Sequence, residues 1–235
     1  MFEAAEDTFA GLLRELASYA TALAAIGADA PPAPRWNQDW FPRLDAAAAY
    51  TMVRRARPRR IVEVGSGHST RFMARAIADG TIACRLTSID PRPRATLEGL
   101  PIEILRNPVQ ECALDPFAAL APGDILFIDS SHRLSAGGDL EFLLQKVLPV
   151  LPAGVLLHFH DIFLPDSYPA HWAWRRYDEQ AAVAALLESG GYAPLFASAW
   201  VVSRRPQWLA QGILAQLPLV PGALESSFWL RRIDS

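Results

Sequence analysis

The sequence has few residues that could build a disulfide framework or a structural zinc site. Cys84 and Cys112 are the two cysteines among 235 residues, and neither belongs to a Cys-x-x-Cys motif or a Cys/His cluster. This usage argues against structural zinc and fits a reducing compartment. We therefore expect a cytoplasmic protein.

Basic charge and long apolar runs are also scarce. The net charge is −3, and Lys146 is the single lysine. Without an overall basic field, we expect neither a nucleic acid nor an anionic membrane as partner. The most apolar N-terminal stretch, residues 9–26, is interrupted by Arg14, Glu15 and Ser18. It therefore predicts neither a membrane span nor a signal peptide.

The chain does have ample material for one packed core, because 51% of its residues are hydrophobic and 20% are charged. This balance excludes intrinsic disorder and collagen. The first segment predicts a helix that ends near Gly27. Its apolar side chains are spaced by three and four residues and form one stripe: Phe9, Leu12, Leu13, Leu16, Ala20 and Leu23. Two interpretations of this stripe remain open. It packs on the body of the same chain, or it forms a homodimer contact or a flap over a ligand site.

A proline-rich connector and a second helix complete the N-terminal part. Residues 28–42 contain four prolines among Trp36, Trp40 and Phe41, which predicts an ordered connector because large aromatic rings favour burial. A helix is expected over residues 44–56. We interpret residues 1–58 as a helical extension packed on the core, and residues 59–235 as the main domain.

From Arg59 onward, short apolar runs alternate with helical patterns, which is typical of a parallel sheet with crossover helices. The expected parallel strands are 60–64, 85–89, 102–105, 125–128 and 155–159. A helix over 178–189, an apolar run over 195–202, a helical stretch over 208–217 and a strand over 227–231 follow. The pattern predicts a single α/β domain with a doubly wound, Rossmann-like sheet, mostly parallel with a terminal strand pair.

The ends of the first two strands carry a glycine loop and a carboxylate. Gly65 and Gly67 flank Ser66, and two glycines at this spacing let the backbone approach a ligand before a helix starts. The loop matches only half of the dinucleotide fingerprint, because Thr70 and Arg71 stand where the third glycine is expected. Asp90 ends the second strand at about the offset of the acidic residue that binds a ribose diol.

The fourth and fifth strands end in further polar groups. Asp129 and His132 follow the fourth strand, and His158, His160 and Asp161 close the fifth. Ligands of doubly wound sheets bind at the carboxyl ends of the strands, so these side chains are candidate site residues.

Four stretches together resemble the class I S-adenosylmethionine-dependent methyltransferases, and more narrowly their small-molecule, mostly O-methylating members. The stretches are EVGSGHSTRF at 63–72, SIDP at 88–91, GDILFIDSSH at 123–132 and HFHDIFLP at 158–165. The resemblance covers about residues 59–232 and implies a seven-stranded sheet whose last strand is antiparallel. It also implies that S-adenosylmethionine (SAM) is the cofactor.

The resemblance assigns roles to single residues. Glu63, Gly65, Ser66 and Gly67 would surround the methionine part of SAM, Asp90 would bind the ribose, and Asp129 would lie beside the sulfonium and the methyl acceptor. The charges agree with this reading, because Glu63 and Asp129 suit the ammonium and sulfonium of SAM better than the pyrophosphate of a dinucleotide.

Two ways of removing the acceptor's proton remain open. Asp129 and Asp161 could chelate a divalent ion such as Mg²⁺, although the sequence offers no obvious third oxygen ligand. Alternatively His132 or His160 could act as general base. If the strand remains regular that far, alternation places His158 and His160 on one face and Phe159 and Asp161 on the other. His158 is expected to be a hydrogen-bonded core residue.

An aromatic segment follows the fifth strand. Residues 162–177 contain Phe163, Tyr168, His171, Trp172, Trp174 and Tyr177. These rings could form a wall for a small-molecule acceptor or could cover the sheet edge. Two other function classes also remain open: a nicotinamide-dependent oxidoreductase, and a non-catalytic nucleotide-binding module of the same fold.

Overall fold

One mixed sheet forms the centre of the computed structural model, which describes residues 1–27 and 30–233. Within these residues the sheet has seven strands in the order β3-β2-β1-β4-β5-β7-β6. They are β1 (Arg60–Val64), β2 (Arg85–Ile89), β3 (Glu103–Leu105), β4 (Ile125–Ile128), β5 (Leu156–Phe159), β6 (Tyr192–Ala197) and β7 (Phe228–Arg232). The first five strands are parallel, and β7 runs antiparallel to both β5 and β6. The predicted doubly wound sheet is confirmed.

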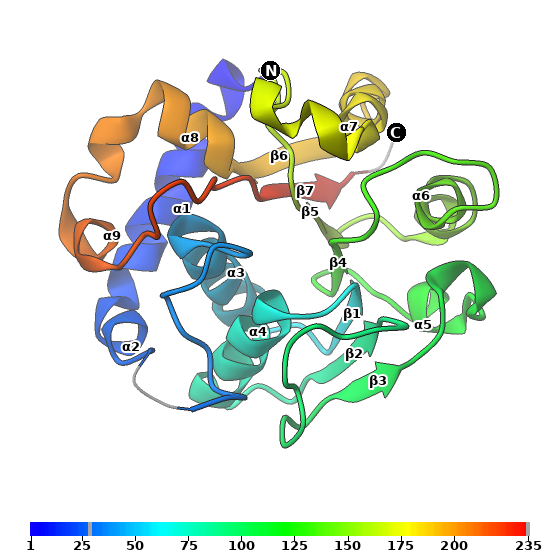
Figure 1. The fold of residues 1–235 in the computed structure, drawn as a ribbon, viewed down its shortest axis with the longest axis horizontal. Coiled ribbons are helices and arrows are strands. Elements are labelled where there is room, and N and C mark those ends of the chain that lie inside the picture. Colours follow the sequence, from blue (N-terminus) through cyan, green and yellow to red (C-terminus); the bar gives the residue numbers. More distant parts are fainter. Residues whose placement is uncertain (28–29, 234–235) are drawn as a thin grey trace.

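Helices cover both faces of this sheet (Figure 1). They are α1 (Glu6–Ser18), α2 (Ala20–Ala24), α3 (Arg43–Ala56), α4 (His68–Asp79), α5 (Asp115–Ala118), α6 (Asp139–Phe142), α7 (Glu179–Glu188), α8 (Ser198–Arg204) and α9 (Gly212–Gln216). In the view of Figure 1, α1, α3 and α4 lie on one side of the strands, and α5 and α6 lie on the other. Among the described residues, no helix combines the length and the apolar character that a membrane crossing requires.

The apolar stripe of the N-terminal helix packs on the body of the same chain. Phe9, Leu12 and Leu16 of α1 are buried, and the Phe9 ring meets Phe196 of β6 and Trp200 of α8 edge-on at 6.0 and 5.4 Å. This packing confirms the first of the two interpretations and removes the stripe as an argument for a dimer contact.

The predicted N-terminal helix is broken, because Tyr19 leaves the helical conformation between α1 and α2. Its ring turns toward α3, where it lies 5.9 Å from the Tyr50 ring and beneath the Arg54 guanidinium. In the connector, Trp36 and Phe41 are buried as expected, whereas Trp40 is exposed. Positions 28 and 29 of the predicted connector, and 234 and 235 of the predicted main domain, lie outside the described residues.

The apolar run over residues 195–202 is not one continuous element. Strand β6 ends at Ala197, and helix α8 begins at Ser198. Ala197 pairs with Phe228, the first residue of β7, and the Ser198 N–H donates to the Ser227 carbonyl just before that strand. The chain then turns into a helix that still buries Trp200 and Val201.

The register of the central strands aligns their carboxyl ends. Val64 at the end of β1 pairs with Ile89 of β2 and Ile128 of β4, and Ile128 pairs with Phe159 of β5. Every residue of β4 is buried, as expected for a strand covered on both faces. The residues that follow these strands consequently share one edge of the sheet.

Gly65 lets the loop after β1 pass against the end of β4. Its φ is +90°, and a Cβ atom at this position would lie 2.0 Å from the backbone oxygen of Asp129. The Gly65 N–H donates to the carbonyl of Ile89, and the Asp129 N–H donates to the carbonyl of Val64, so both segments are fixed. A Cβ at Gly67, in contrast, would meet no atom within 4 Å.

We expect Gly65→Ala to lower the free energy of unfolding by at least about 3 kcal/mol, since a side chain there needs both a strained φ and a shift of the Asp129 backbone. Gly67→Ala is the matched control and should change stability by no more than about 1 kcal/mol. Urea denaturation of both variants measures the difference. Equal stability of the two variants would show that the loop can move away from β4.

Candidate active site

Glu63 lies under the glycine loop and is fully buried. Its two carboxylate oxygens accept hydrogen bonds from the hydroxyls of Ser69, Thr70 and Ser88. Burial raises the pKa of Glu63 to about 7, although the three hydroxyl donors oppose the shift. The carboxylate ties the start of α4 to β1 and β2, so this geometry does not support the predicted direct contact between Glu63 and a cofactor.

Ser66 and Asp90 meet across the ends of β1 and β2, as the sequence predicts. The Ser66 hydroxyl donates to Asp90 Oδ2 at 2.6 Å, and the Arg92 N–H donates to Asp90 Oδ1 at 2.7 Å. Both residues are half-buried, and the space beside Gly67 is open. Ser66, Gly67 and Asp90 therefore form one partly exposed polar surface at the carboxyl ends of β1 and β2, called the polar ledge below.

Four predicted residues gather at the ends of β4 and β5. His132 Nε2 lies 3.3 Å from Asp129 Oδ1 and 3.6 Å from Asp161 Oδ2. His160 Nδ1 lies 3.6 Å from Asp129 Oδ1 and 3.5 Å from Asp161 Oδ1. Two imidazole rings thus bridge two carboxylates. His132, His160 and Asp161 are buried, whereas the Asp129 side chain is 32% exposed and gives the cluster its opening to solvent.

Two further carboxylates, absent from the sequence prediction, bind the outer nitrogens of these rings. Glu179 Oε2 lies 2.8 Å from His132 Nδ1, and Asp45 Oδ2 lies 3.3 Å from His160 Nε2. Asp45 belongs to α3 and Glu179 is the first residue of α7, so both come from helices rather than strand ends. The sequence shows only that each is an acidic residue in the first turn of a helix, which by itself does not indicate a ring partner.

Strand alternation would place His160 and Asp161 on opposite faces only if the strand stayed regular as far as residue 161, and it does not. Strand β5 ends at Phe159, and Asp161 adopts a left-handed φ of +55°, which turns both side chains into the same cluster. His132 is also left-handed, with φ +59°. Such conformations are costly for non-glycine residues and are concentrated at functional sites. The expectation for His158 is confirmed: it is buried, and Nε2 lies 2.8 Å from the Ser227 hydroxyl.

The cluster shifts the pKa of its members in opposite directions. Burial alone would lower the pKa of both histidines, but contacts with Asp129 and Glu179 raise the pKa of His132 well above its ordinary value. Asp129, Asp161 and Asp45 do the same for His160. Burial alone would raise the pKa of Asp129, and the two rings instead lower it. Protonated rings and an ionised Asp129 therefore stabilise one another.

The residues at this edge do not fit Mg²⁺. Asp129 and Asp161 supply carboxylate oxygens, but His132 Nε2 and His160 Nδ1 face the space between them. Mg²⁺ demands near-octahedral coordination by oxygen. Across residues 1–27 and 30–233, no three or more His, Cys, Asp or Glu side chains are arranged to hold a metal ion. The structure thus gives no support to the Mg²⁺ hypothesis for Asp129 and Asp161.

The aromatic segment after β5 lies against the cluster. The Tyr177 ring lies 4.6 Å from the His132 ring at an interplanar angle of 42°, and Arg175 lies 4.1 Å above the Trp172 ring. Arg175 Nη1 also lies 3.8 Å from Asp161 Oδ2. At least this part of the segment borders the candidate site, as the acceptor-wall hypothesis requires, whereas Trp174 is 75% exposed.

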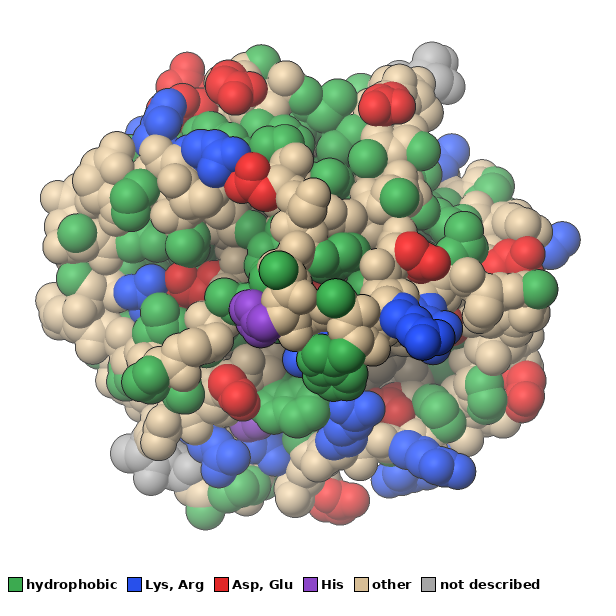
Figure 2. Space-filling model, turned by 45° about the horizontal axis from the view of Figure 1, so that its top comes forward, with side chains coloured by type: hydrophobic (Ala, Val, Ile, Leu, Met, Phe, Trp, Pro, Cys, Tyr) green, Lys and Arg blue, Asp and Glu red, His purple; other side chains and the backbone are tan. Residues whose placement is uncertain are grey.

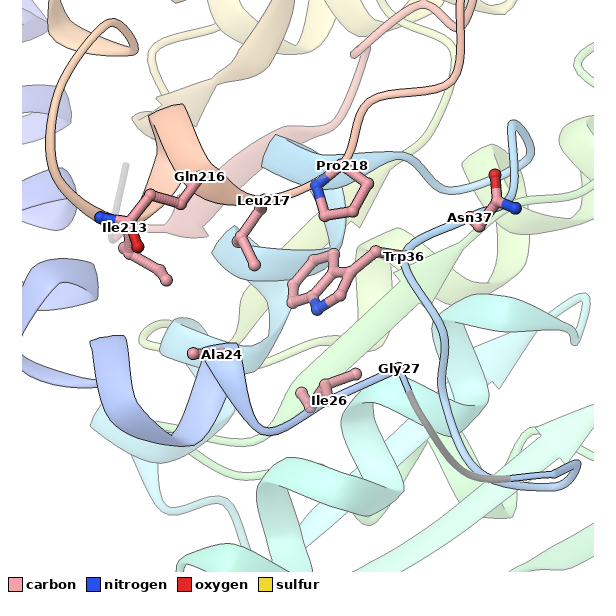
Figure 3. A pocket seen from close by; sticks show the side chains of 9 residues that line it. All are labelled: Ala24, Ile26, Gly27, Trp36, Asn37, Ile213, Gln216, Leu217 and Pro218. Atoms are coloured by element: carbon pink, nitrogen blue, oxygen red, sulfur yellow. The ribbon is translucent and has the colours of Figure 1, made fainter.

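Two surface cavities lie away from the strand ends. One, of about 340 Å³, is bordered by Trp36, Ile213, Leu217 and Pro218 (Figure 3). The other, of about 450 Å³, lies between α1 and the α9 region. Neither includes a predicted site residue. On the face shown in Figure 2, acidic, basic and hydrophobic side chains are interspersed.

We expect Glu63 to make stability depend on pH. Between pH 4.5 and 7 the folded chain keeps a proton on Glu63 that the unfolded chain has lost, so the free energy of unfolding falls as pH rises. The contribution amounts to at most about 1.4 kcal/mol per pH unit. Denaturation curves of Glu63→Gln should lack it, whereas Glu111→Gln, an exposed control, should follow the wild type. Parallel curves for wild type and Glu63→Gln would contradict the raised pKa.

Comparisons with known proteins agree with this architecture. Residues 62–162 match the family described as a methyltransferase domain. The structure of the methyltransferase PaMTH1 from Podospora anserina, bound to S-adenosylhomocysteine (SAH), is 17% identical with a TM-score of 0.50, and the alignment covers 95% of this chain and 88% of that one. A Mg–SAM complex of cmcI is 16% identical with a TM-score of 0.50, over 91% and 84% of the two chains.

A third structure, an O-methyltransferase from Bacillus cereus in complex with SAH, is 14% identical with a TM-score of 0.48, over 95% and 91% of the chains. At these identities the likeness to PaMTH1 and cmcI, both with a TM-score of 0.50, shows a shared fold. No curated protein sequence matches the chain significantly. The domain match over residues 62–162 and the strand order 3-2-1-4-5-7-6 agree with the methyltransferase resemblance of the sequence and with the fold that the chain shares with PaMTH1 and cmcI.

Proposed function

We propose that the chain transfers a methyl group from SAM to an oxygen atom of a small molecule. The observation that carries this proposal is the convergence of the Gly65–Gly67 loop, Asp90 and Asp129 on one edge of a methyltransferase domain. PaMTH1 and cmcI, which share the fold, are bound to SAH and to SAM respectively, which supports the choice of cofactor.

The chain's own residues suit such a cofactor. Gly67 leaves open space where a side chain would stand, and Asp90 offers a carboxylate that could accept two hydrogen bonds from a ribose diol. Asp129 is a partly exposed anion whose lowered pKa keeps it ionised beside a cation. Glu63 supports the loop from below. When bound, SAM would supply an electrophilic methyl group on a positively charged sulfur.

His132 and His160 are the proposed bases. In the reaction a new O–CH₃ bond forms as the S–CH₃ bond breaks, and the hydroxyl proton passes to an imidazole nitrogen. Each ring must first be neutral, and its contact with Asp129 opposes this. A cation beside Asp129 would weaken the hold of that carboxylate on the ring protons. Asp129 and Asp161 would orient the rings and the acceptor.

A small-molecule acceptor is favoured by the aromatic segment and by the lack of an overall basic charge. Tyr177 and Trp172 offer stiff rings beside the cluster, and the net charge is −3. The small number of cysteines supports a cytoplasmic location.

A non-catalytic SAM-binding module is the second candidate. His132, His160 and Asp161 are buried in mutual contacts, as a structural role would require. The two candidates differ in turnover, since a module would bind SAH without releasing product. A nicotinamide-dependent oxidoreductase would instead bind a nicotinamide dinucleotide and not SAH.

Asp90→Ala should weaken SAH binding about 5- to 150-fold, because ribose hydroxyls would lose a charged partner worth roughly 1 to 3 kcal/mol. Isothermal titration calorimetry with SAH measures the affinity, and NAD⁺ serves as the competing ligand. Asp115→Ala is the control, since Asp115 is an exposed residue of α5. Unchanged SAH affinity in folded Asp90→Ala protein would remove Asp90 from the cofactor site.

Methyl transfer should survive complete removal of divalent ions, because the donor set does not fit Mg²⁺. The assay follows tritiated methyl groups from SAM into a panel of phenols and sugars, with EDTA or with added Mg²⁺. His132→Ala or His160→Ala should lower the rate roughly 10²- to 10⁴-fold. Loss of turnover in EDTA with recovery in Mg²⁺ would restore the metal mechanism. SAH binding without methylation of any panel member would favour the module.

A further inference from the structure

We propose that Glu179 and Asp45 are positioning residues of the active site. Each binds the outer nitrogen of one histidine and thereby leaves the inner nitrogen facing Asp129 and Asp161. Both carboxylates lie outside residues 62–162, so the matched domain segment supplies the rings and the rest of the chain orients them.

The Glu179 carboxylate is fully buried and therefore needs a hydrogen-bonding or charged partner. Its Oε2 lies 2.8 Å from His132 Nδ1. Burying a carboxylate is costly unless a hydrogen bond or an opposite charge compensates for the lost hydration. The His132 ring is the hydrogen-bond partner of Glu179, so the carboxylate and the ring fix each other.

The start of α7 also holds the backbone of His132. The carbonyl of His132 accepts hydrogen bonds from the N–H groups of Asp178 and Glu179, at 3.1 and 3.3 Å. Asp178 Oδ1 accepts a bond from the Leu134 N–H at 2.6 Å. His132 has a left-handed backbone, and such a conformation persists only when its surroundings enforce it. The ring and its main chain are therefore held by one helix terminus.

Asp45 binds the outer nitrogen of the His160 ring, as Glu179 binds that of His132. It is fully buried in α3, and its oxygens accept hydrogen bonds from the Ser226 and Ser227 N–H groups, both at 2.9 Å. Its Oδ2 also lies 3.3 Å from His160 Nε2. His160 Nδ1 is then the nitrogen that faces Asp129 and Asp161.

This arrangement determines which nitrogen of each neutral ring carries the proton. For His132 the outer contact is the shorter one, 2.8 Å to Glu179 against 3.3 and 3.6 Å to Asp129 and Asp161. For His160 it is 3.3 Å to Asp45 against 3.6 and 3.5 Å to Asp129 and Asp161. The proton of each neutral ring therefore stays on the nitrogen that faces Glu179 or Asp45. The inner nitrogen, Nε2 of His132 and Nδ1 of His160, is then free to take a proton. A catalytic role for the inner nitrogens rests on the proposed methyl transfer. The position of the proton on each neutral ring depends only on the contacts within the protein. The ionisable groups facing the two rings are Asp45, Asp129, Asp161, Glu179, Tyr177 and His158.

Nitrogen-15 NMR of the wild-type protein tests the inference directly. Labelled histidine rings are titrated with and without SAH and assigned with His132→Gln and His160→Gln. We expect the neutral His132 ring to carry its proton on Nδ1 and the neutral His160 ring on Nε2. Exposed His171 serves as the internal reference. A His132 proton on Nε2, or a His160 proton on Nδ1, would overturn the assignment for that ring.

Glu179→Gln gives a second readout. A Gln side chain can turn its NH₂ group toward His132 Nδ1, which would move the proton of the neutral ring to Nε2. The pKa of His132 should fall as well, and methyl transfer to a panel substrate should slow roughly 10- to 100-fold. Glu188→Gln, an exposed change at the other end of α7, should leave all three unchanged. A His132 ring unaltered by Glu179→Gln would refute the positioning role.

SAH affinity separates this inference from the proposed function. Glu179→Gln should keep SAH binding within about twofold, since Glu179 touches none of the residues assigned to the cofactor except through His132. If the wild type does not bind SAH, the proposed function is refuted. The nitrogen-15 spectra would still show whether Glu179 and Asp45 determine the proton positions on the two rings. If Glu179→Gln does not fold, the wild-type spectra decide alone.

Discussion

The register of four parallel strands determines where the strand-end residues of the candidate site lie. Because β1, β2, β4 and β5 end level with one another, the residues that follow them meet at one edge of the sheet. Gly65 makes this possible, since its missing side chain lets the loop after β1 rest on the carbonyl of Asp129. The polar ledge of Ser66 and Asp90 and the cluster around Asp129 are two consequences of that single contact.

The cluster is a balance of charges that none of its members could maintain alone. Burial raises the pKa of Glu179, whereas the two rings lower the pKa of Asp129, and the carboxylates raise the pKa of both rings against the effect of burial. Asp129 is the member that reaches solvent. A cation arriving beside it would therefore change the protonation of both rings. The same contacts that stabilise the resting site thus make it responsive to a positively charged ligand.

The fold could be predicted from the sequence because its signals are local and repeated. Short apolar runs with acidic or glycine ends predicted the parallel strands and placed Asp90, Asp129 and Asp161 correctly at the sheet edge. The roles of Asp45 and Glu179 could not be predicted, since each depends on a contact between elements far apart in the sequence. The convergence of His160 and Asp161 escaped alternation because it depends on a left-handed residue just beyond the strand, which periodicity does not detect.

The N-terminal helices are part of the site's construction as well as of its core. Helix α3 packs beside α4. Its Asp45 connects the helix to two other segments: the residues after β5 through His160, and the residues before β7 through the Ser226 and Ser227 N–H groups. Arg43 in the same helix pairs with Glu225 at 2.9 Å, one residue before that segment. Without α3, two buried N–H groups and one ring nitrogen would lose their acceptor, which costs more than the loss of an exposed contact. The candidate site therefore includes residues on both sides of the predicted boundary between residues 1–58 and 59–235.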